Sequence, residues 1–331
     1  MSLLSRIQSL ATDIHQETIE KRRHIHAHPE LSFEEAETAA YVKTQLDALG
    51  IAAETDVAGH GLVGRIEGTA PGGSEKVVAL RADMDALPIV EANDVPYVST
   101  RPGVMHACGH DVHTSSLLGT ARILQSVRDQ FSGTIKLLFQ PAEEKVPGGA
   151  SLMVKAGVLQ NPQVEAVFGQ HVQPFMDVGK IGVRPGMYMA SADEIYLHVK
   201  GKGGHGAQPA SFIDPIMITA QILVTLQQVV SRADPRIPSI LSFGKIIAEG
   251  ATNVIPETVY VAGTYRTMDE TRRAKALEQI QQIATSVAAG LGGSVEVEIR
   301  RGYPVLFNDE ALTARSRDWI CDYMGEENVI D

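Results

Sequence analysis

The sequence predicts an α/β protein of two domains. Up to Pro185, short apolar runs with strand character alternate with helical runs, which is the order of a layered α/β domain with a mixed sheet flanked by helices. After Pro185 the order becomes strand, helix, strand, strand, helix and strand, the βαββαβ order of a ferredoxin-like α+β domain. The 331 residues also exceed the size at which a single hydrophobic core usually stops growing. We therefore expect residues 188–299 to form a domain inserted into a first domain made of residues 1–187 and 300–331.

The first domain is expected to begin with two helices. Ile7, Leu10 and Ile14 recur at helical spacing with charged residues between them. This segment lacks the apolar core and small-residue cleavage site of an export signal. Further on, Ser32 and Glu35 form a capping-box signature, which predicts the start of another helix.

That helix is expected over residues 33–49, ending at Gly50. Its buried face is expected to consist of Ala40, Leu46 and Leu49. The remaining elements of the first domain are expected, in chain order, at GLVGRIEG (strand), KVVALRAD (strand), Asp111 to Val127 (helix), TIKLLFQ (strand), Ser151 (short helix) and VEAVFGQH (strand).

The second domain is expected to start at the strand IYLHVKG and to end near Tyr303, where the chain returns to the first domain. Between these points the elements are expected, in chain order, at residues 213–230 (helix), SILSFGKII (strand), TVYVAGTYR (strand), residues 270–289 (helix) and SVEVEIR (strand). Residues 213–222 and the strand SFGKIIAEG are candidates for a homodimer interface.

Composition excludes two classes of partner. The net charge of −11 argues against sequence-independent nucleic-acid binding, which depends on clustered Lys and Arg. No apolar stretch approaches the roughly 20 residues that a membrane span requires. Only Cys108 and Cys321 are present, so a disulfide framework is not expected, and a reducing, cytoplasmic location fits.

Three sequence blocks carry residues of the types that bind metal ions. Cys108 and His110 lie in HACGHDVH, Glu144 in PAEE and His171 in FGQH. Each block follows a strand-like run, and in open α/β sheets the residues beyond the carboxyl ends of strands converge on one crevice. A thiolate, two imidazoles and a carboxylate suit zinc or another borderline divalent ion. The alternative for the Cys-x-His pair alone is a buried small residue and a residue at a helix start.

Glu143 lies directly beside Glu144, and neighbouring carboxylates repel each other unless they are separated or solvated. A solvated loop pair is one interpretation. The pair follows the apolar run LLFQPA, however, and adjacent side chains diverge in a non-helical segment. One carboxylate could then bind a metal ion while Glu143 serves as the general base that deprotonates a water molecule.

Other polar residues near these blocks have weaker signals. Asp83 and Asp85, in RADMDALP, either orient a metal-binding histidine or form a turn or helix cap. The histidines at positions 24, 26 and 28 are expected to pack at a helix end, because a helix places only the first and last of them on one face. His106 and His113 flank the proposed ligands, and Cys321 is expected to be a buried small residue.

The sequence resembles a family of co-catalytic metallohydrolases that includes aminoacylases, hippurate hydrolases, auxin-conjugate hydrolases and related carboxypeptidases. The resemblance covers nearly the whole chain, and its segments occur in the family's order. They are RRHIHAHPELSFEE, RADMDALP, HACGHDVH, QPAEE, GGA, GQHV, GKGGHGAQP, DP, ATNVIPE, GTYRT and GYPVLFND. The cysteine indicates the amidohydrolase branch, because other branches use a carboxylate at that position.

The resemblance implies a zinc-peptidase-like catalytic domain with two divalent metal ions per subunit, of zinc, manganese, cobalt or nickel. The implied ligands are Cys108, His110, Glu144 and His171, with Glu143 as the general base. It also implies that the inserted domain is a lid through which two subunits form a homodimer.

Three lid residues are implied to contact the substrate. His205, in GKGGHGAQP, looks like the histidine that reaches a partner's active site and stabilises the carbonyl oxygen in the transition state. Asn253 and Arg266 look like the residues that hold a free carboxylate, for which the planar fork of Arg is suited. The family's centre also uses a further histidine after the GYPVLFND block, whereas the last histidine here is His205, so we expect a further segment beyond Asp331.

The leading hypothesis is thus metal-dependent hydrolysis of N-acyl amino acids, of the hippurate or N-acetyl kind. The alternatives on the same scaffold are a carboxypeptidase or dipeptidase and an N-acetyl-diaminopimelate deacetylase. An alternative of another class is a non-catalytic protein that binds such ligands without a complete metal site.

Overall fold

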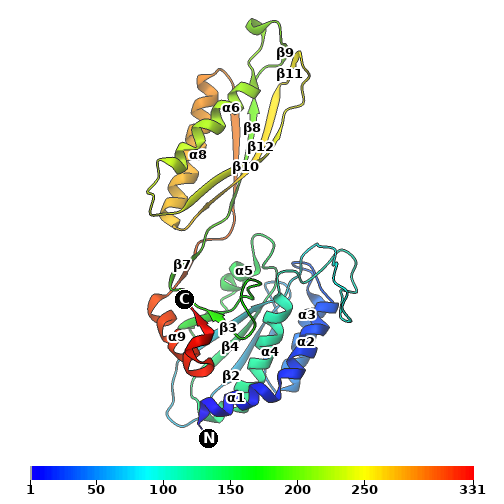
Figure 1. The fold of residues 1–331 in the computed structure, drawn as a ribbon, viewed down its shortest axis with the longest axis vertical. Coiled ribbons are helices and arrows are strands. Elements are labelled where there is room, and N and C mark those ends of the chain that lie inside the picture. The colour runs from blue at the N-terminus through cyan, green and yellow to red at the C-terminus, as the bar shows by residue number, and fades with distance from the viewer. Residues whose placement is uncertain (1) are drawn as a thin grey trace. The chain divides into compact units, whose positions relative to one another are not determined.

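The computed structural model describes residues 2–331 and divides the chain into two compact units (Figure 1). The first unit ends at Gly179, and the second is Lys180–Asp331. In the described part of the chain, no helix is both long and apolar enough to cross a lipid bilayer.

The first unit is a five-stranded mixed sheet with helices on both faces, as the alternating pattern predicted (Figure 1). The sheet order is β1-β2-β4-β3-β5, in which β3 pairs in parallel with both β4 and β5 while β2 pairs antiparallel with β1 and β4. The strands are β1 Ala53–Val57, β2 Gly61–Glu67, β3 Val77–Asp83, β4 Thr134–Gln140 and β5 Ala166–Gly169. The helices are α1 Leu3–Asp13, α2 His15–Ala27, α3 Ala36–Ala48, α4 His110–Ser126 and α5 Gly149–Lys155, with a short 3-10 turn η1 at Arg128–Gln130.

The two faces of β4 explain the layering of this unit. Leu137 and Phe139 point to one face, where they pack with residues of α3 and α4, whereas Leu138 points to the other and packs with Met153 of α5. This alternation follows from the two-residue period of a strand. Both faces of the central strand are therefore buried, which explains its apolar run LLF.

The predicted start of α3 is wrong. Ser32 does not cap the helix, because its hydroxyl donates to Asp85 at 2.6 Å, and α3 begins only at Ala36. The free amides of its first turn, those of Glu37 and Thr38, donate instead to the buried carboxylate of Glu30 at 3.2 and 2.7 Å. A capping group supplied from outside the helix leaves no capping-box signal in the sequence.

The predicted face of α3 is also partly wrong. Ala40 is exposed, and the buried residues are Thr38, Val42 and Leu46. The predicted end is confirmed, since Gly50 follows the helix with φ +68°, a conformation that glycine adopts without strain. Cys321 is half-buried rather than buried.

The second unit contains the predicted βαββαβ segment, folded as a four-stranded antiparallel sheet in the order β10-β12-β8-β13 (Figure 1). Its strands are β8 Asp193–Lys200, β10 Ser239–Ile247, β12 Thr258–Thr267 and β13 Ser294–Arg301. Its helices are α6 Pro215–Leu226, α7 Gln228–Ser231 and α8 Glu270–Gly290. The long predicted helix is thus interrupted at Gln227, between α6 and α7.

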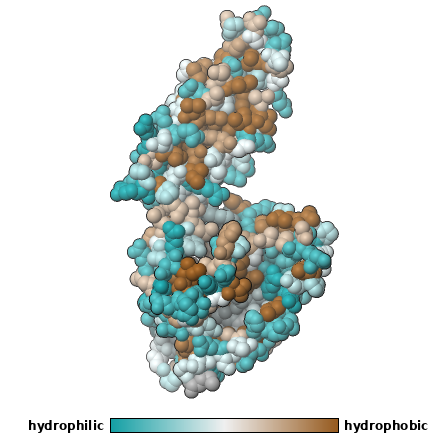
Figure 2. All heavy atoms as spheres, in the orientation of Figure 1, coloured by the Kyte–Doolittle hydropathy of each residue, from teal (hydrophilic) through white to brown (hydrophobic). Residues whose placement is uncertain are grey.

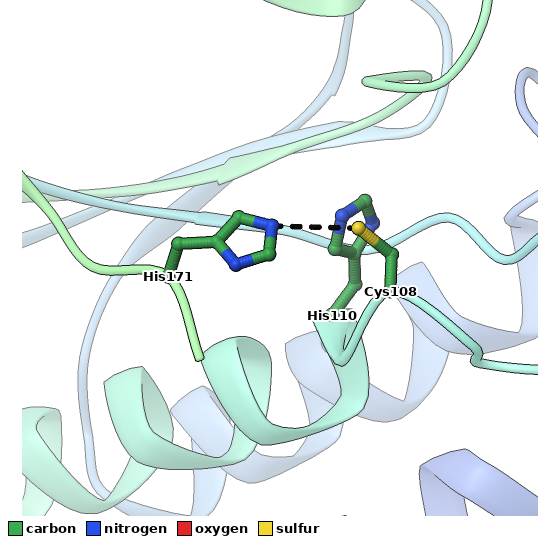
Figure 3. A group of neighbouring side chains, drawn as sticks. All are labelled: Cys108, His110 and His171. Atoms are coloured by element: carbon green, nitrogen blue, oxygen red, sulfur yellow. Dashed lines mark hydrogen bonds between the residues drawn. The ribbon is translucent and has the colours of Figure 1, made fainter. Parts of the chain in front are cut away.

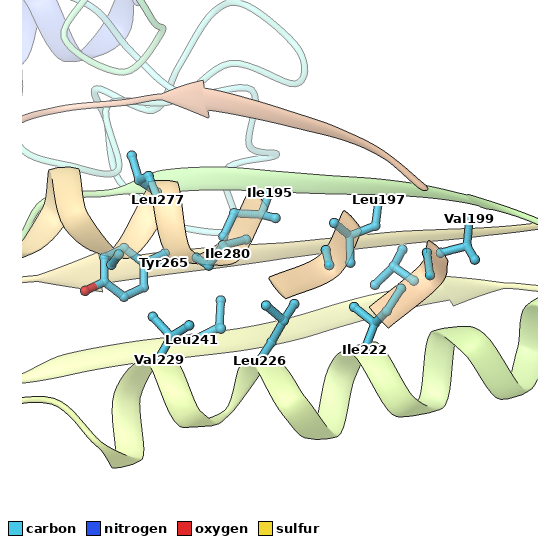
Figure 4. Close-up of a cluster of buried hydrophobic side chains, with 14 of the residues drawn as sticks. Ile195, Leu197, Val199, Ile222, Leu226, Val229, Leu241, Tyr265, Leu277 and Ile280 are labelled. Carbon is cyan, nitrogen blue, oxygen red and sulfur yellow. The ribbon is translucent and has the colours of Figure 1, made fainter. Parts of the chain in front are cut away.

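One face of this sheet forms the core of the second unit (Figure 4). Ile195, Leu197 and Val199 alternate along β8 toward the helices, where they meet Ile222 of α6 and Ile280 of α8. Figure 2 shows that apolar side chains also gather on the surface of this unit. The exposed apolar residues of α6 and β10 are Ile216, Met217, Val224, Ile240, Ile246 and Ile247.

Short elements complete the second unit. β9 Gly204–His205 pairs with β11 Val254–Ile255, and neither strand was expected from the sequence. β14 Leu306–Asn308 pairs with β7 Gly186–Met189, and β15 Val329–Ile330 pairs with β6 Ile181–Gly182. The remaining elements are the helix α9 Glu310–Met324 and the 3-10 turns η2 Pro209–Ser211 and η3 Glu326–Asn328. The assignment of residues 300–331 to the catalytic domain stays a prediction.

Candidate metal centre

The candidate site lies in the first unit, at the carboxyl ends of the parallel strands β3, β4 and β5. Asp83 ends β3, Gln140 ends β4 and Gly169 ends β5, and all three strands pair side by side in this sheet. The segments that follow them carry Asp85, Glu143 with Glu144, and His171. Parallel pairing therefore brings together residues that are distant in the sequence.

Cys108 and His171 are in contact across this edge (Figure 3). The Cys108 Sγ lies 3.4 Å from the His171 Nε2, and His110 lies beside them from the first turn of α4. The His171 Nδ1 donates to the Val172 carbonyl oxygen at 2.7 Å, which leaves the Nε2 lone pair of the neutral ring directed at the thiol. Gly109 turns the chain between Cys108 and His110 with φ +91°, where a β-carbon would also lie 2.2 Å from a methyl group of Val172.

Asp85 connects two of the proposed ligands. The His110 Nδ1 donates to the Asp85 carbonyl oxygen at 2.8 Å and lies 3.2 Å from its carboxylate Oδ1. The other carboxylate oxygen, Oδ2, accepts from the Glu144 amide at 2.9 Å and from Ser32. Asp85 thus fixes the ring orientation of His110 and the backbone of Glu144 with one side chain, which supports the orienting interpretation over that of a simple turn.

Asp83 makes a second, parallel arrangement with His113. The His113 Nδ1 donates to the Asp83 Oδ1 at 2.6 Å, and the His113 Nε2 accepts from the Val172 amide at 2.9 Å. Arg81 pairs with the other Asp83 oxygen at 2.6 Å. Asp83 therefore holds the segment next to His171 through His113, while its Oδ2 is 3.6 Å from the His110 Nε2.

The open nitrogen of His110 points at the two glutamates. Its Nε2 lies 3.8 Å from the Glu144 Oε1 and 3.9 Å from the Glu143 Oε2. The two glutamates come from a loop that is partly accessible, whereas His110 is fully buried at the start of α4. The two glutamates are therefore partly exposed to solvent, whereas His110 is not.

Negative groups dominate the electrostatics of the site. Burial would lower the pKa of His110, but the hydrogen bond to Asp85, the thiol of Cys108 and the charge of Asp83 together raise it to about 11. Contact with Cys108 raises the pKa of His171 to about 9 despite its partial burial. Burial, and then the charge of Glu144, raises the pKa of Glu143 above its ordinary value. These groups favour a positive charge at the position they surround.

The donor atoms fit a divalent cation. The His110 Nε2 and the Glu144 Oε1 are both buried, and neither makes a hydrogen bond within residues 2–331. Buried polar atoms without partners are rare, because each loses its interaction with water. Since the two atoms face each other at 3.8 Å beside the Cys108 and His171 pair, a metal ion would satisfy them with ligand types that zinc and similar ions accept.

The proposed lid residues lie in the second unit and fall into two groups. β11 pairs with β9 so that Val254 lies opposite His205, and the Gly206 amide donates to the Asn253 carbonyl oxygen at 2.8 Å. Asn253 and His205 are therefore neighbours. The Ala207 amide donates to the His205 Nδ1 at 3.1 Å, so the neutral ring carries its proton on Nε2 and can donate it outward.

Arg266 lies in a different sheet, the four-stranded one, and at the end of β12 that is far from β11. β12 begins at Thr258, three residues after β11 ends, whereas Arg266 is near its far end, opposite Ile240 of β10. An extended strand rises about 3.3 Å per residue, so about 26 Å separate the backbones of Thr258 and Arg266. The structure therefore brings His205 and Asn253 together but separates both from Arg266.

A metal-binding donor set with an adjacent carboxylate, at the strand ends of an α/β sheet, is the arrangement of a metal-dependent hydrolase. The chain belongs to peptidase family M20/M25/M40, whose sequence profile matches residues 79–331. It is thus a metal-dependent hydrolase of amide bonds, which confirms the family and the enzyme class expected from the sequence motifs.

Individual relatives agree with this family. The chain is 44% identical to an N-acyl-L-amino acid amidohydrolase of Geobacillus stearothermophilus over 92% of this chain and 81% of that protein. It is 40% identical to thermostable carboxypeptidase 2 of Saccharolobus solfataricus over 95% of this chain and 79% of that protein. It also resembles the crystal structure of the Bacillus subtilis YXEP protein, a dinuclear metal binding peptidase from the M20 family. That match has a TM-score of 0.79 and 35% identity and covers 93% of this chain and 79% of the other.

A buried polar network near the site was not expected from the sequence. His26 was interpreted only as part of a helix-end cluster, yet it is buried and its Nδ1 lies 2.7 Å from the Asp111 carboxylate at the start of α4. Arg22 pairs with the same Asp111 oxygen at 2.7 Å, and Glu91 lies 3.0 Å from the His26 Nε2. This network ties α2 to the first turn of α4, next to His110. Its members are up to 89 residues apart (22 to 111), so a local sequence pattern cannot predict this network.

Proposed function

We propose that this chain hydrolyses the amide bond of N-acyl amino acids, releasing a carboxylic acid and a free amino acid. The observation that carries the proposal is the meeting of two unpartnered buried donor atoms, the His110 Nε2 and the Glu144 Oε1, beside the Cys108 and His171 contact and next to Glu143. The identity to an N-acyl-L-amino acid amidohydrolase supports this choice of substrate class.

Two divalent ions, of zinc, manganese, cobalt or nickel, are the proposed cofactors. Cys108, His110, Glu144 and His171 would hold them, and the dinuclear metal binding YXEP protein supports that number. When bound, such ions polarise a carbonyl group and make water a stronger acid. Asp85 and Asp83 hold the ligand geometry through His110, the Glu144 amide and His113.

Glu143 is the proposed general base. Its carboxylate lies close to the His110 Nε2, on a loop that remains accessible, so it can reach both a water molecule and a bound substrate. It would accept a proton from the attacking water and then return a proton to the leaving nitrogen of the amide. The raised pKa of Glu143, caused by burial and by Glu144, suits a group that must both accept and release a proton.

The separation of Arg266 from His205 bears on how the lid residues are used. An N-acyl amino acid is far shorter than the roughly 26 Å of strand between Thr258 and Arg266. For Arg266 to hold the substrate carboxylate while His205 donates to the developing oxyanion, the two residues must come from different subunits. Asn253 would act from the same subunit as His205, since the two are neighbours.

A homodimer is therefore part of the proposal, and the second unit offers a surface for it. β10 is an edge strand of the four-stranded sheet, with Ile240, Ile246 and Ile247 exposed along it. Edge strands with exposed apolar side chains readily pair with another chain. The helix α6, which packs on the neighbouring strand β12, exposes Ile216, Met217 and Val224. A cytoplasmic location, inferred from the two free thiols of Cys108 and Cys321, remains a further proposal.

The test combines metal analysis with a substrate panel. The purified chain is equilibrated with zinc or manganese, its metal content is measured by elemental mass spectrometry, and release of free amino acid is followed for N-acetyl and N-benzoyl amino acids. We expect two ions per chain and hydrolysis that a chelator abolishes. Hydrolysis that continues undiminished in the chelator would contradict the metal mechanism, and binding of acyl amino acids without any turnover would favour a non-catalytic binding protein.

A carboxypeptidase is the second candidate, favoured by the 40% identity to thermostable carboxypeptidase 2. The same panel therefore includes dipeptides, blocked peptides and N-acetyl-diaminopimelate. A higher kcat/KM on peptides than on acyl amino acids would select the carboxypeptidase function instead, and a preference for N-acetyl-diaminopimelate would select a biosynthetic deacetylase.

A further inference from the structure

Glu35 is a fully buried carboxylate that has no part in the proposed reaction. It lies in the segment HPELSFEE, directly before α3, and it is 0% exposed. Its Oε1 accepts two backbone hydrogen bonds, whereas its Oε2 is buried and makes none with residues 2–331. A buried charged group with a half-satisfied carboxylate costs stability, so its presence calls for a reason beyond packing.

The two hydrogen bonds of Glu35 both hold backbone in an unusual conformation. The Oε1 accepts from the Ala142 amide at 2.6 Å and from the Phe33 amide at 3.0 Å. Ala142 has φ +47° and Phe33 has φ +70°, in the left-handed region that residues with a β-carbon rarely adopt. The contact with Ala142 spans 107 positions of the sequence and is therefore tertiary.

Ala142 is the residue from which the two catalytic-loop glutamates project. It follows the end of β4 by two residues and directly precedes Glu143 and Glu144. Its own carbonyl oxygen accepts from the Gly149 amide at 2.9 Å, so both of its peptide groups are fixed. Two residues later, the Glu144 amide donates to Asp85 at 2.9 Å. Two buried carboxylates, those of Glu35 and Asp85, thus hold the loop on either side of Glu143.

We propose that Glu35 is a positioning residue for Glu143 and Glu144: by holding the Ala142 amide it sets the left-handed turn that directs both carboxylates into the metal site. This inference rests on the proposed roles of Glu143 as general base and Glu144 as metal ligand. Without the hydrogen bond from Ala142 to Glu35, the turn relaxes toward a common backbone conformation and the two glutamates lose their shared direction.

The chain contains a matched control in Glu30. Glu30 is also a buried carboxylate before α3, and it also accepts two backbone amides, those of Glu37 and Thr38. Its contacts end on α3 and Arg101 and do not include the loop of Ala142. Removing Glu30 therefore costs comparable local stability without affecting the glutamate loop.

The experiment compares Glu35→Ala, Glu35→Gln and Glu30→Ala with the unmodified full chain. Amide hydrogen exchange of peptides that cover residues 141–149 is measured without metal, and manganese affinity is measured by calorimetry. For Glu35→Ala we expect faster exchange in this loop and a metal affinity weaker by roughly 10–100-fold, the usual effect of losing a group that orients a ligand. Glu35→Gln keeps an acceptor oxygen for both amides and is expected to stay within about 3-fold of the unmodified chain.

Kinetics supply the second readout. Glu35→Ala is expected to lower kcat more than it changes KM, because a displaced general base affects the chemical step rather than substrate binding. If Glu35→Ala is recovered unfolded by circular dichroism, Glu35→Asp replaces it, since its carboxylate is one methylene too short to reach Ala142. Equal loop exchange and equal metal affinity in the Glu35 and Glu30 variants would overturn the inference. Absence of hydrolysis in the unmodified chain would refute the proposed function alone, because exchange and metal affinity test Glu35 without turnover.

Discussion

The Cys108 Sγ lies 3.4 Å from the His171 Nε2, although 63 positions of the sequence separate the two residues. Their contact joins the segment before α4 to the segment after β5, and the neighbouring His110 and His171 rings lower the pKa of the Cys108 thiol. A thiol with a lowered pKa is more readily deprotonated, and the thiolate is the form that binds metal ions. The same contact therefore brings two proposed ligands together and favours the thiolate form of Cys108, which binds cations.

Replacing Cys108 with alanine is expected to abolish tight metal binding. The change removes the thiolate and leaves His171 without its partner across the site, so bound metal should fall from two ions per chain to less than one. Elemental mass spectrometry after equilibration with zinc checks this. Cys321→Ala is the control, because that thiol contacts Arg317 in the second unit, and full metal content in Cys108→Ala would contradict the proposed ligand set.

Replacing Glu143 with glutamine is expected to leave metal binding unchanged and to lower kcat by about 10²–10⁴-fold, the usual contribution of a general base. The amide keeps the size of the side chain but cannot accept a proton. Steady-state hydrolysis of an N-acyl amino acid and metal analysis of the same sample separate the two effects. Glu34→Gln, on the exposed turn before α3, is the control. A Glu143→Gln variant that retains full kcat would exclude this role.

Mixing two inactive variants is expected to restore activity if the lid residues come from different subunits. In a mixed dimer, one subunit carries His205→Ala and the other carries Arg266→Ala. If each site uses Arg266 from one subunit and His205 from the other, one of the two sites receives both intact side chains and the other receives neither. Random subunit exchange should then restore about a quarter of the activity, because half of the dimers carry one working site of two.

The pair His205→Ala and Asn253→Ala is the matched control for that experiment. These two residues are neighbours and act from the same subunit, so every site in a mixed dimer lacks at least one of them. No activity should return. Restoration in the control pair, or none in the test pair, would contradict the assignment of Arg266 and His205 to different subunits.

The order of helices and strands could be predicted because the spacing of apolar residues differs between the two kinds of element. Strands such as β3 and β4 are buried on both faces and read as apolar runs, and the second unit alternates cleanly along β8. β1 was missed because its residues are mostly exposed and polar. β9 and β11 were missed because two-residue strands leave no periodic signal.

The candidate site was only half predictable, for a different reason. The proposed metal ligands could be found in the sequence because their residue types bind metal ions and because each block that contains them follows a strand-like run. They are Cys108, His110, Glu144 and His171. The residues that hold them do so through tertiary contacts. Glu35 looks like part of a capping box, yet it contacts Ala142 across 107 positions. The local sequence pattern therefore predicts a helix-capping role for Glu35, whereas the structure shows that Glu35 binds the Ala142 amide.

Breaking the buried ion pair of the second unit is expected to destabilise that unit strongly. Arg273 donates to both carboxylate oxygens of Asp193 at 2.9 and 2.7 Å, and both side chains are almost fully buried. Arg273→Ala leaves Asp193 charged and without its main partner, so the free energy of unfolding should fall by about 3–5 kcal/mol. Urea denaturation followed by circular dichroism measures it. Arg236→Ala removes an exposed pair with Asp234 and should produce no measurable change; an equally small effect for Arg273→Ala would contradict this argument.

The pH dependence of stability tests whether Glu35 is buried as a charge. Burial raises the pKa of Glu35, although the amides of Ala142 and Phe33 act against the shift. A raised pKa means that the folded chain binds this proton more tightly than the unfolded chain, so its contribution to stability is complete below the unfolded value of about 4.3. The contribution is lost as the pH rises through the folded value.

Glu35→Gln has no proton to lose at this position. Its melting temperature relative to that of the unmodified chain should therefore increase from pH 4 to pH 8, and the two should differ least at the acidic end. Melting is measured in chelator, so that metal binding does not contribute. Because Glu35→Gln retains the acceptor for Ala142, the difference reports the charge and not the loss of the hydrogen bond. A difference in melting temperature that stays constant across this range would show that Glu35 is not the source of pH-dependent stability.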